Sequence, residues 1–295
     1  MIIDQFHGEA ARKKLALVLG GGGGKGGAHL GVLGQLELLG LPIDMFIGTS
    51  IGGVVAALYA AGYSIGEIAN NFTSTSLWRL MDPDPLGLGL LGMSHFRSSV
   101  EDMLGELTFE ELKYPCAVVA GDLVTGQEVV IDSGPIVDAL MASVALPGIF
   151  PPVRRGDMLL ADGGVVNNVP VDVAYARGAD KVIAVDLGGM QGGFQLPPTT
   201  VSLLPNVPLT IANRGLGVLI AQLTRCRLEQ HPPDVLICPQ VDHIGMLDFV
   251  RVNEGQAAGE AATQAVADQL LEIYAWRTDG APLPQLALPS FSEAV

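Results

Sequence analysis

Residues Leu19–Gly31 read LGGGGGKGGAHLG, in which five consecutive glycines precede a lysine and two further glycines. Glycine weakens ordinary helices and strands because it loses the most conformational freedom on folding. The run nevertheless lies between an apolar strand pattern, KLALVLG at 14–20, and a helical pattern over 28–39. A glycine loop between a strand and a helix presents several unpaired backbone N–H groups in one direction. The sequence therefore predicts an anion-binding loop here.

Two kinds of anion could occupy such a loop. Gly21, Gly23 and Gly26 satisfy the GxGxxG pattern of dinucleotide-binding proteins, which expects a ribose-binding acid about 20 residues later. Asp44 stands near that distance, but it opens the next strand pattern instead of closing one. The GxxxxGK[ST] phosphate loop is not satisfied, because Lys25 is followed by glycine. The other anion is the oxyanion of an acyl-transfer intermediate, which requires a serine nucleophile nearby.

The segment Gly48–Gly52, GTSIG, offers that serine in a GxSxG pattern. The strand-like IDMFI at 43–47 precedes it, and a helical pattern over 51–61 follows it. A nucleophile elbow needs this strand–turn–helix context, because the sharp turn leaves no room for side chains beside the serine. Ser50 is therefore a candidate nucleophile, and the alternative is a plain helix N-cap.

A third short motif, DGG at Asp162–Gly164, follows the strand-like DMLLA at 157–161. Taken alone, it predicts only an Asx turn after a strand. In the order glycine loop, GTSIG and DGG, the three motifs resemble the patatin-like phospholipase family. The resemblance covers 14–188, and it includes MASVALPGIFPPV at 141–153 and the segment from DGG to 188.

The resemblance implies a serine acyl hydrolase with a Ser–Asp dyad, no catalytic histidine, no cofactor and no metal. Ser50 would be the nucleophile, and Asp162 the base that takes its proton. A free aspartate titrates near ~3.9, so Asp162 must lie close to Ser50 in an apolar, water-poor site. Backbone N–H groups of the glycine loop would hold the oxyanion, and those around Gly22–Gly24 are favoured. The residues assigned to this oxyanion hole are Gly21, Gly22, Gly23, Gly24, Lys25 and Gly26, and the supporting turn glycines are Gly48, Gly52, Gly163 and Gly164.

An alternative to the dyad is a triad that includes a histidine. His231 and His243 follow Ser50 and Asp162 in the Ser…Asp…His order of α/β-hydrolases. Both histidines have a loop-like context, which favours the dyad. His29 lies in the first turns of the helix after the glycine loop, and we expect a structural or cleft-lining role for it.

Three further polar residues lie close to the motifs. Lys25 stands where the family often has arginine, which leaves open whether this side chain supports the loop. Asn167 and Asn168 follow DGG, and we expect them to cap or cross-link that turn.

Composition excludes several classes of function. The chain has 16 basic and 31 acidic residues, a net charge of -15, which disfavours nucleic acid and binding to anionic membranes by charge alone. Cys116, Cys226 and Cys238 are widely spaced and resemble the reduced cysteines of an intracellular protein. The first residues do not resemble a signal peptide, so we expect a cytoplasmic protein, with peripheral membrane contact. The uncharged run 45–66 is long enough to span a membrane, but its polar residues and strand-like start argue against a span.

Apolar strand patterns alternate with helical patterns along the chain, which predicts a mainly parallel sheet covered on both faces. The expected fold is a three-layer α/β/α sandwich over 14–295, preceded by an extension at 1–13. A single long helix is expected over 253–276. Two leucine-rich segments with little charge, 82–96 and 187–209, are expected to be loops that contact something apolar.

The sequence thus predicts an enzyme that cleaves carboxylic esters of phospholipids or related lipids through an acyl-serine intermediate. It would contact a membrane or micelle transiently through its apolar loops. The alternatives are a nucleotide-binding Rossmann-like oxidoreductase and a relative that binds lipid or protein without catalysis. Head-group preference, chain length, the choice among phospholipase, lysophospholipase and esterase, and oligomeric state are not predicted.

Overall fold

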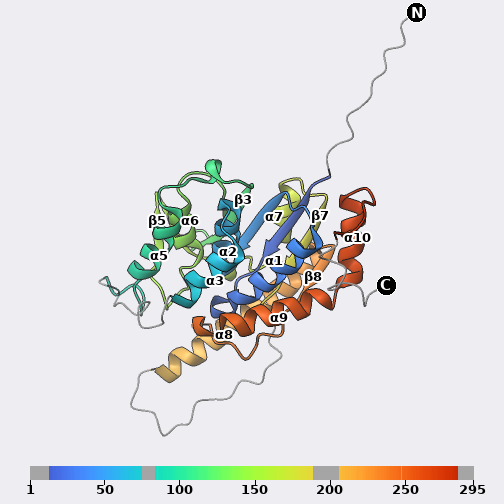
Figure 1. Ribbon diagram of the computed structural model, residues 1–295. Coiled ribbons are helices and arrows are strands. Elements are labelled where there is room, and N and C mark those ends of the chain that lie inside the picture. The colour runs from blue at the N-terminus through green and yellow to red at the C-terminus, as the bar shows by residue number, and fades with distance from the viewer. Residues whose placement is uncertain (1–12, 75–83, 85, 189–205, 247, 285–295) are drawn as a thin grey trace, which may run out of the picture.

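A computed structural model describes residues 13–74, 84, 86–188, 206–246 and 248–284 (Figure 1). Within these residues the strands form one eight-stranded sheet. Parallel pairing joins β1 to β2 and β7, β2 to β3, and β7 to β8, whereas β4, β5 and β6 run antiparallel to their neighbours. The path of hydrogen-bonded neighbours is β5 (Val153–Arg155), β6 (Met158–Asp162), β3 (Cys116–Asp122), β2 (Met45–Thr49), β1 (Leu15–Leu19), β7 (Lys181–Val185) and β8 (Val235–Ile237), and β4 (Glu128–Ile131) also pairs with β3.

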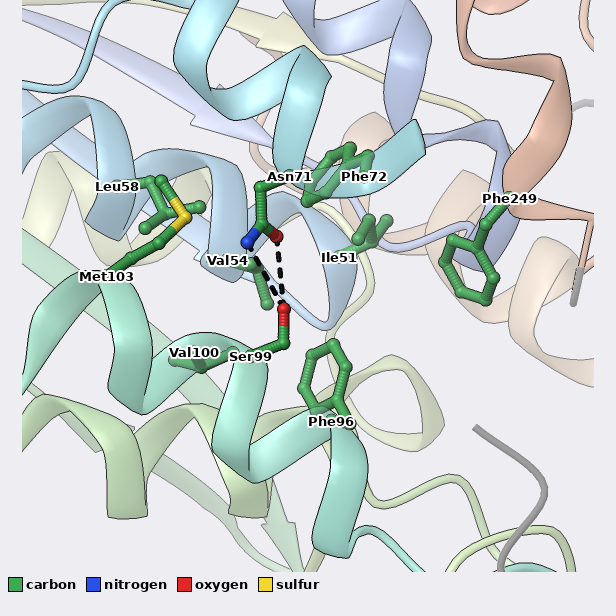
Figure 2. Close-up of a pocket in the computed structure, with 10 residues that line it drawn as sticks. All are labelled: Ile51, Val54, Leu58, Asn71, Phe72, Phe96, Ser99, Val100, Met103 and Phe249. Carbon is green, nitrogen blue, oxygen red and sulfur yellow. Dashed lines mark hydrogen bonds between the residues drawn. The ribbon is translucent and has the colours of Figure 1, made fainter. Parts of the chain in front are cut away.

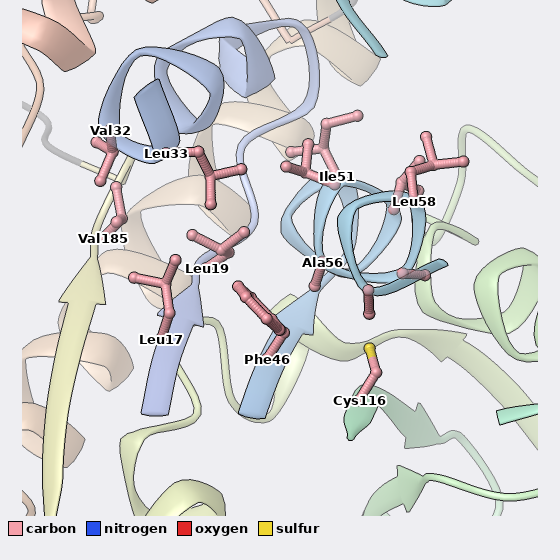
Figure 3. Packing of buried hydrophobic residues seen from close by; sticks show 14 of the residues in the cluster. Leu17, Leu19, Val32, Leu33, Phe46, Ile51, Ala56, Leu58, Cys116 and Val185 are labelled. Atoms are coloured by element: carbon pink, nitrogen blue, oxygen red, sulfur yellow. The ribbon is translucent and has the colours of Figure 1, made fainter. Parts of the chain in front are cut away.

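The sheet is buried on both faces, and helices form the outer layers. Alternate residues of a strand point to opposite faces, so Leu15, Leu17 and Leu19 of β1 pack on one side while Ala16 and Val18 pack on the other. Figure 3 shows the first face, where side chains of the sheet meet α1 and α2. That layer contains α1 (Gly27–Leu39), α2 (Ile51–Ala61), α3 (Ile65–Ser74), α5 (Ser94–Leu104), α6 (Ile136–Ser143), α9 (Val252–Gln264) and α10 (Ala267–Arg277), and the opposite layer contains α7 (Val171–Ala176) and α8 (Asn206–Gln230). The predicted three-layer α/β/α sandwich with a mainly parallel sheet is confirmed.

The register of the sheet brings the ends of β2 and β6 together. Both β4 and β2 pair with β3 at Val118 and Val119, so they must lie on opposite edges of β3. Both β4 and β6 pair with β3 at Ala120 and Gly121, so β6 lies on the same edge as β2. Parallel β2 ends opposite Val119, and antiparallel β6 ends opposite Ala120. The two strands therefore meet with their carboxyl ends facing each other.

The predicted single helix over 253–276 is wrong, because the chain bends between α9 and α10. The two helices have different packing partners. On α9, a side chain at Gly259 would overlap the backbone carbonyl of Ala28 on α1, so these helices touch backbone to backbone. In contrast, α10 reaches the far end of the sheet, where Arg277 Nη2 lies 2.9 Å from Asp44 Oδ1. One straight helix would not follow both surfaces.

The two predicted loops are also corrected, because α5 begins inside 82–96 and α8 begins inside 187–209. Parts of both segments, and residues 1–12 of the predicted extension, lie outside the described residues. The limits of the predicted domain stay a prediction. The uncharged run 45–66 forms β2, α2 and the start of α3. Among the helices that the structure describes, none is both long and apolar enough to cross a membrane.

Candidate active site

Ser50 occupies a strained turn between β2 and α2. Its backbone has φ 54° and ψ −127°, and only Asp279 shares a positive φ among the described residues other than glycine. Backbone strain of this kind persists only where the surrounding structure enforces it. A side chain at Gly48 would overlap the backbone of Gly52, and one at Gly52 would overlap the carbonyl of Leu19. Both glycines of GTSIG are therefore required by the close approach of backbone to backbone.

Asp162 lies at the end of β6, where the register places it opposite the serine turn. Its Oδ2 accepts a hydrogen bond of 2.6 Å from Ser50 Oγ, and its Oδ1 accepts one of 2.7 Å from the Gly164 N–H. Burial raises the pKa of this carboxyl to about 6, although the hydrogen bonds from Ser50 and Gly164 act in the opposite direction. A higher pKa makes a carboxylate a better proton acceptor near neutral pH. A side chain at Gly163 would overlap the carbonyl of Val119, so the DGG turn also depends on bare backbone.

Ser143 on α6 holds the backbone of the serine turn, a contact that the sequence analysis missed. Its Oγ accepts the Ser50 N–H at 2.9 Å and donates to the Val119 carbonyl at 2.7 Å. The side chain is fully buried. The N–H of Ser50 is therefore occupied in this conformation. The signal available in the sequence was a single serine within the apolar helical pattern at 135–146.

The glycine loop lies beside Ser50, and only some of its amides remain open. A Cβ at Gly21 would lie 3.2 Å from Ser50 Cβ, which places the loop next to the serine. The Gly21 N–H is bound to the Asn168 carbonyl, the Gly24 N–H to the Met246 carbonyl and the Lys25 N–H to the Gly22 carbonyl. Gly26 ends the 3-10 helix Gly23–Gly26. Within the described part of the chain, the amides of Gly22 and Gly23 form no hydrogen bond.

Two polar side chains, those of Asn168 and Lys25, fix the loop. Asn168 Nδ2 donates to the Gly21 carbonyl at 3.4 Å and thereby links the loop to the DGG turn, as expected of this asparagine. Lys25 Nζ donates to the Leu187 carbonyl at 3.0 Å and lies 3.7 Å from Asp242 Oδ1, so its side chain does support the loop. Burial lowers the pKa of Lys25, whereas Asp242 and Asp186 raise it.

His29 contacts the backbone at the start of the same loop and takes no part in the contact between Ser50 and Asp162. Its Nε2 lies 2.8 Å from the Gly20 carbonyl, to which it donates as a neutral ring. Burial lowers the pKa of this histidine to about 4, so it stays neutral at physiological pH. The structural role expected of His29 agrees with these contacts.

The residues required by the alternative interpretations lie elsewhere. His231 is exposed after α8, and exposed His243 faces Glu254 at 3.4 Å, so neither is bonded to Ser50 or Asp162. Asp44 lies at the start of β2, where its carboxylate accepts from the Leu15 N–H and pairs with Arg277. A ribose-binding acid would instead follow the end of that strand. Within the described residues, no group of three or more His, Cys, Asp or Glu side chains is placed to hold a metal ion.

An apolar pocket lies between α2, α3 and α5 (Figure 2). One of its lining residues is Ile51, which follows Ser50 in the chain. Ile51 forms part of its wall and also lies against Gly26 of the glycine loop. Asn71 and Ser99 are the polar residues of its lining, and they bond to each other at 3.2 Å. The lining residues are Ile51, Val54, Leu58, Asn71, Phe72, Phe96, Ser99, Val100, Met103 and Phe249.

The fold and the site together define an α/β protein with a serine elbow, a facing carboxylate and a glycine loop. The model of the patatin-like phospholipase family matches residues 17–175. The chain therefore belongs to the patatin-like phospholipase family, as the sequence motifs had indicated.

Individual relatives agree with this assignment. An uncharacterised NTE family protein of Mycobacterium tuberculosis is 33% identical over 279 residues, which cover 86% of this chain and 46% of that protein. A second one from the same organism is 36% identical over 182 residues, which cover 61% of this chain and 51% of that protein. Lysophospholipase NTE1 of Debaryomyces hansenii is 31% identical over 284 residues, which cover 88% of this chain and 18% of that protein. The chain thus spans about half or less of the length of these relatives.

A likeness in fold extends to VipD from Legionella pneumophila. Its crystal structure covers 96% of this chain and 73% of that one, with a TM-score of 0.57 and 14% sequence identity. At this identity the comparison shows a shared fold and nothing about activity.

Proposed function

We propose that this chain hydrolyses carboxylic esters of lipids, with Ser50 as nucleophile and Asp162 as its base. The observation that carries the proposal is the hydrogen bond of 2.6 Å from Ser50 Oγ to Asp162 Oδ2. Membership in the patatin-like phospholipase family and the likeness to a lysophospholipase support a lipid substrate. The raised pKa of Asp162, about 6, supports its role as base.

In the proposed reaction, Asp162 takes the proton of Ser50 while Oγ attacks the ester carbonyl carbon. The carbonyl oxygen becomes an oxyanion, which the open N–H groups of Gly22 and Gly23 stabilise. The C–O bond of the ester then breaks, and the departing alcohol takes the proton from Asp162. Water hydrolyses the acyl-Ser50 intermediate in a second round, in which Asp162 again accepts a proton and returns it to Ser50.

We place the acyl chain of the substrate on the side of Ser50 where the apolar pocket lined by Ile51 lies; the pocket has an internal volume of about 20 Å³, so its walls must move apart to admit a chain. Its walls are aliphatic and aromatic apart from Asn71 and Ser99, which satisfy each other by hydrogen bonding. Apolar pockets with few polar groups bind apolar ligands by removing their surface from water. Ile51 lines this pocket and directly follows Ser50 in the chain, so an acyl chain attached to Ser50 could extend along Ile51.

The proposal is tested by ester hydrolysis. The wild-type chain should release fatty acid from phospholipid or lysophospholipid micelles and p-nitrophenol from p-nitrophenyl butyrate, with a rate that rises through about pH 6 as Asp162 loses its proton. Ser50→Ala should remove both activities and retain the fold by circular dichroism. Equal hydrolysis by Ser50→Ala, or none by the folded wild type on any ester, would refute the proposal.

Ser143→Ala should lower kcat about tenfold and leave KM nearly unchanged. Removing the hydroxyl leaves the Ser50 N–H without its acceptor and relaxes the strained turn that aims Oγ at the substrate. Thr263→Ala is the matched control, because Thr263 is also a fully buried hydroxyl bonded to a carbonyl, but on α9. Steady-state kinetics of Ser143→Ala and Thr263→Ala measure the two effects on kcat and KM. If Ser143→Ala lost stability but kept the wild-type kcat, Ser143 would have a purely structural role.

A further inference from the structure

The segment that follows β8, residues 241–246, packs against the glycine loop. The carbonyl of Met246 accepts the Gly24 N–H at 2.6 Å. A side chain at Gly23 would overlap that same carbonyl, and one at Gly24 would lie 2.6 Å from the Gly245 carbonyl. The backbone of this segment therefore lies directly against Gly23, whose N–H forms no hydrogen bond within the described part of the chain.

A charged contact joins the same two parts of the chain. Lys25 Nζ in the glycine loop lies 3.7 Å from Asp242 Oδ1. The side chains of Lys25 and Asp242 are only 17% and 23% exposed, so water screens this pair in part. Asp186 belongs to the same group of charges, because burial raises its pKa, Lys25 lowers it and Asp242 raises it. Lys25 thus interacts with two carboxylates, one just after β7 and one after β8.

These contacts support the glycine loop on two sides. On one side, a Cβ at Gly22 would lie 2.9 Å from Leu187 Cβ. On the other side, Gly23 lies against Met246. Lys25 reaches both supports, since its Nζ donates to the Leu187 carbonyl at 3.0 Å and faces the carboxylate after β8. A shift of either support would therefore move the amides of Gly22 and Gly23.

We propose that Asp242 is a positioning residue, which acts through Lys25 to hold the amides of Gly22 and Gly23 where the oxyanion forms. The proposal rests on the proposed function, because an oxyanion arises only if Ser50 attacks an ester. Oxyanion donors are effective only when they already point to the position of the developing charge. A partly exposed ion pair adds little to stability, but a small displacement of catalytic groups costs much of the rate.

Steady-state hydrolysis of p-nitrophenyl butyrate by Asp242→Asn tests this role. The amide keeps the shape of the carboxylate and removes its charge. We expect kcat to fall about tenfold, less than for the loss of a whole oxyanion donor, while KM stays nearly unchanged. Asp234→Asn is the matched control and should keep the wild-type kcat. Asp234 is a 24% exposed carboxylate that lies 3.0 Å from Lys181 Nζ, just before β8.

A propyl trifluoromethyl ketone separates oxyanion binding from ground-state binding. In the proposed mechanism Ser50 Oγ adds to its carbonyl carbon, Asp162 takes the serine proton, and the carbonyl oxygen becomes the oxyanion. Because this adduct resembles the tetrahedral intermediate, its inhibition constant should rise about tenfold in Asp242→Asn, in step with the loss of kcat. A lower melting temperature with an unchanged inhibition constant would refute the positioning role and leave Asp242 a structural one.

The effect of Asp242 must also depend on Lys25. Asp242→Asn should lower kcat in the wild-type chain but not in the Lys25→Met background, because the ammonium on which the carboxylate acts is then absent. An equal loss of kcat in both backgrounds would refute the proposal. An unchanged kcat, a change confined to KM, or an equal loss in Asp234→Asn would also refute it.

Hydrogen exchange distinguishes a failure of this proposal from a failure of the proposed function. The Gly24 N–H, which binds the Met246 carbonyl, should exchange about tenfold faster in Asp242→Asn than in wild type or Asp234→Asn. Mass spectrometry of the peptide 19–31 measures this rate without any substrate. Absence of all hydrolysis by the folded wild type would refute the proposed function. Equal exchange in the three proteins would show that Asp242 does not hold the loop.

Discussion

Asp162→Asn should lower kcat about a thousandfold and at the same time make the protein more stable at pH 8. The amide has nearly the shape of the carboxyl but cannot accept the proton of Ser50. Activity falls because the serine loses its base, while Ser50 itself and the open amides of Gly22 and Gly23 remain in place. Loss of activity with a gain in stability is a signature that a purely structural aspartate would not produce.

The gain in stability follows from the raised pKa of Asp162. In the folded chain this pKa is about 6, above the ordinary value of 3.8, because burial disfavours the charged form. The contribution of this carboxyl to stability is therefore full below about pH 4 and is lost as the pH rises through about 6. The shift corresponds to about 3 kcal/mol, which Asn avoids at pH 8.

Thermal unfolding of wild type and Asp162→Asn at pH 8 and pH 4 measures this difference. The variant should melt at a higher temperature than wild type at pH 8, and the gap should close at pH 4. Comparing the two proteins at each pH cancels the contribution of His29, whose pKa burial lowers to about 4. A variant that is less stable at pH 8, or one that retains wild-type kcat, would show that Asp162 is not a buried base.

Gly52→Ala should destabilise the fold by about 3 kcal/mol and abolish the reaction of Ser50. The added methyl group would overlap the Leu19 carbonyl and lie 2.6 Å from the Gly20 carbonyl. Neither atom can withdraw easily, because Leu19 is in the central strand β1 and the Gly20 carbonyl is bound to His29. The start of α2 would have to move, and the serine turn would move with it.

Gly66→Ala on α3 is the control for Gly52→Ala. Among the described residues, no atom outside the neighbouring backbone of α3 lies within 4 Å of the added methyl group at Gly66, and alanine favours the helix by up to about 1 kcal/mol. Urea unfolding followed by circular dichroism should therefore show a large loss for Gly52→Ala and none for Gly66→Ala. Similar stabilities for the two variants would mean that the turn is not as tightly packed as described.

The sequence predicted those features that depend on short-range patterns. The helix expected over 51–61 matches α2 (Ile51–Ala61). A glycine turn marks the start of this helix, and an apolar run marks its extent. The order of strands and helices likewise predicted the sandwich. Of the six residues assigned to the oxyanion hole, Gly21, Gly24 and Lys25 bind carbonyls with their N–H groups and Gly26 ends the 3-10 helix, whereas those of Gly22 and Gly23 form no hydrogen bond with any residue that the structure describes.

Other features depend on contacts between distant parts of the chain and could not be derived from spacing. The facing ends of β2 and β6 result from their shared edge on β3, which no local pattern encodes. Ser143 reaches Ser50 across 93 residues. The bend between α9 and α10 follows from two packing surfaces, whereas the helical periodicity of 253–276 continues through it.

Reaction of the protein with a fluorophosphonate, followed by peptide mass spectrometry, distinguishes a serine activated by Asp162 from one activated by a histidine. We expect one covalent label, on Ser50, which persists when His231 and His243 are both changed to Ala and disappears in Asp162→Asn. A folded protein that takes no label on Ser50, or one whose label depends on either histidine, would contradict a serine activated by Asp162 alone.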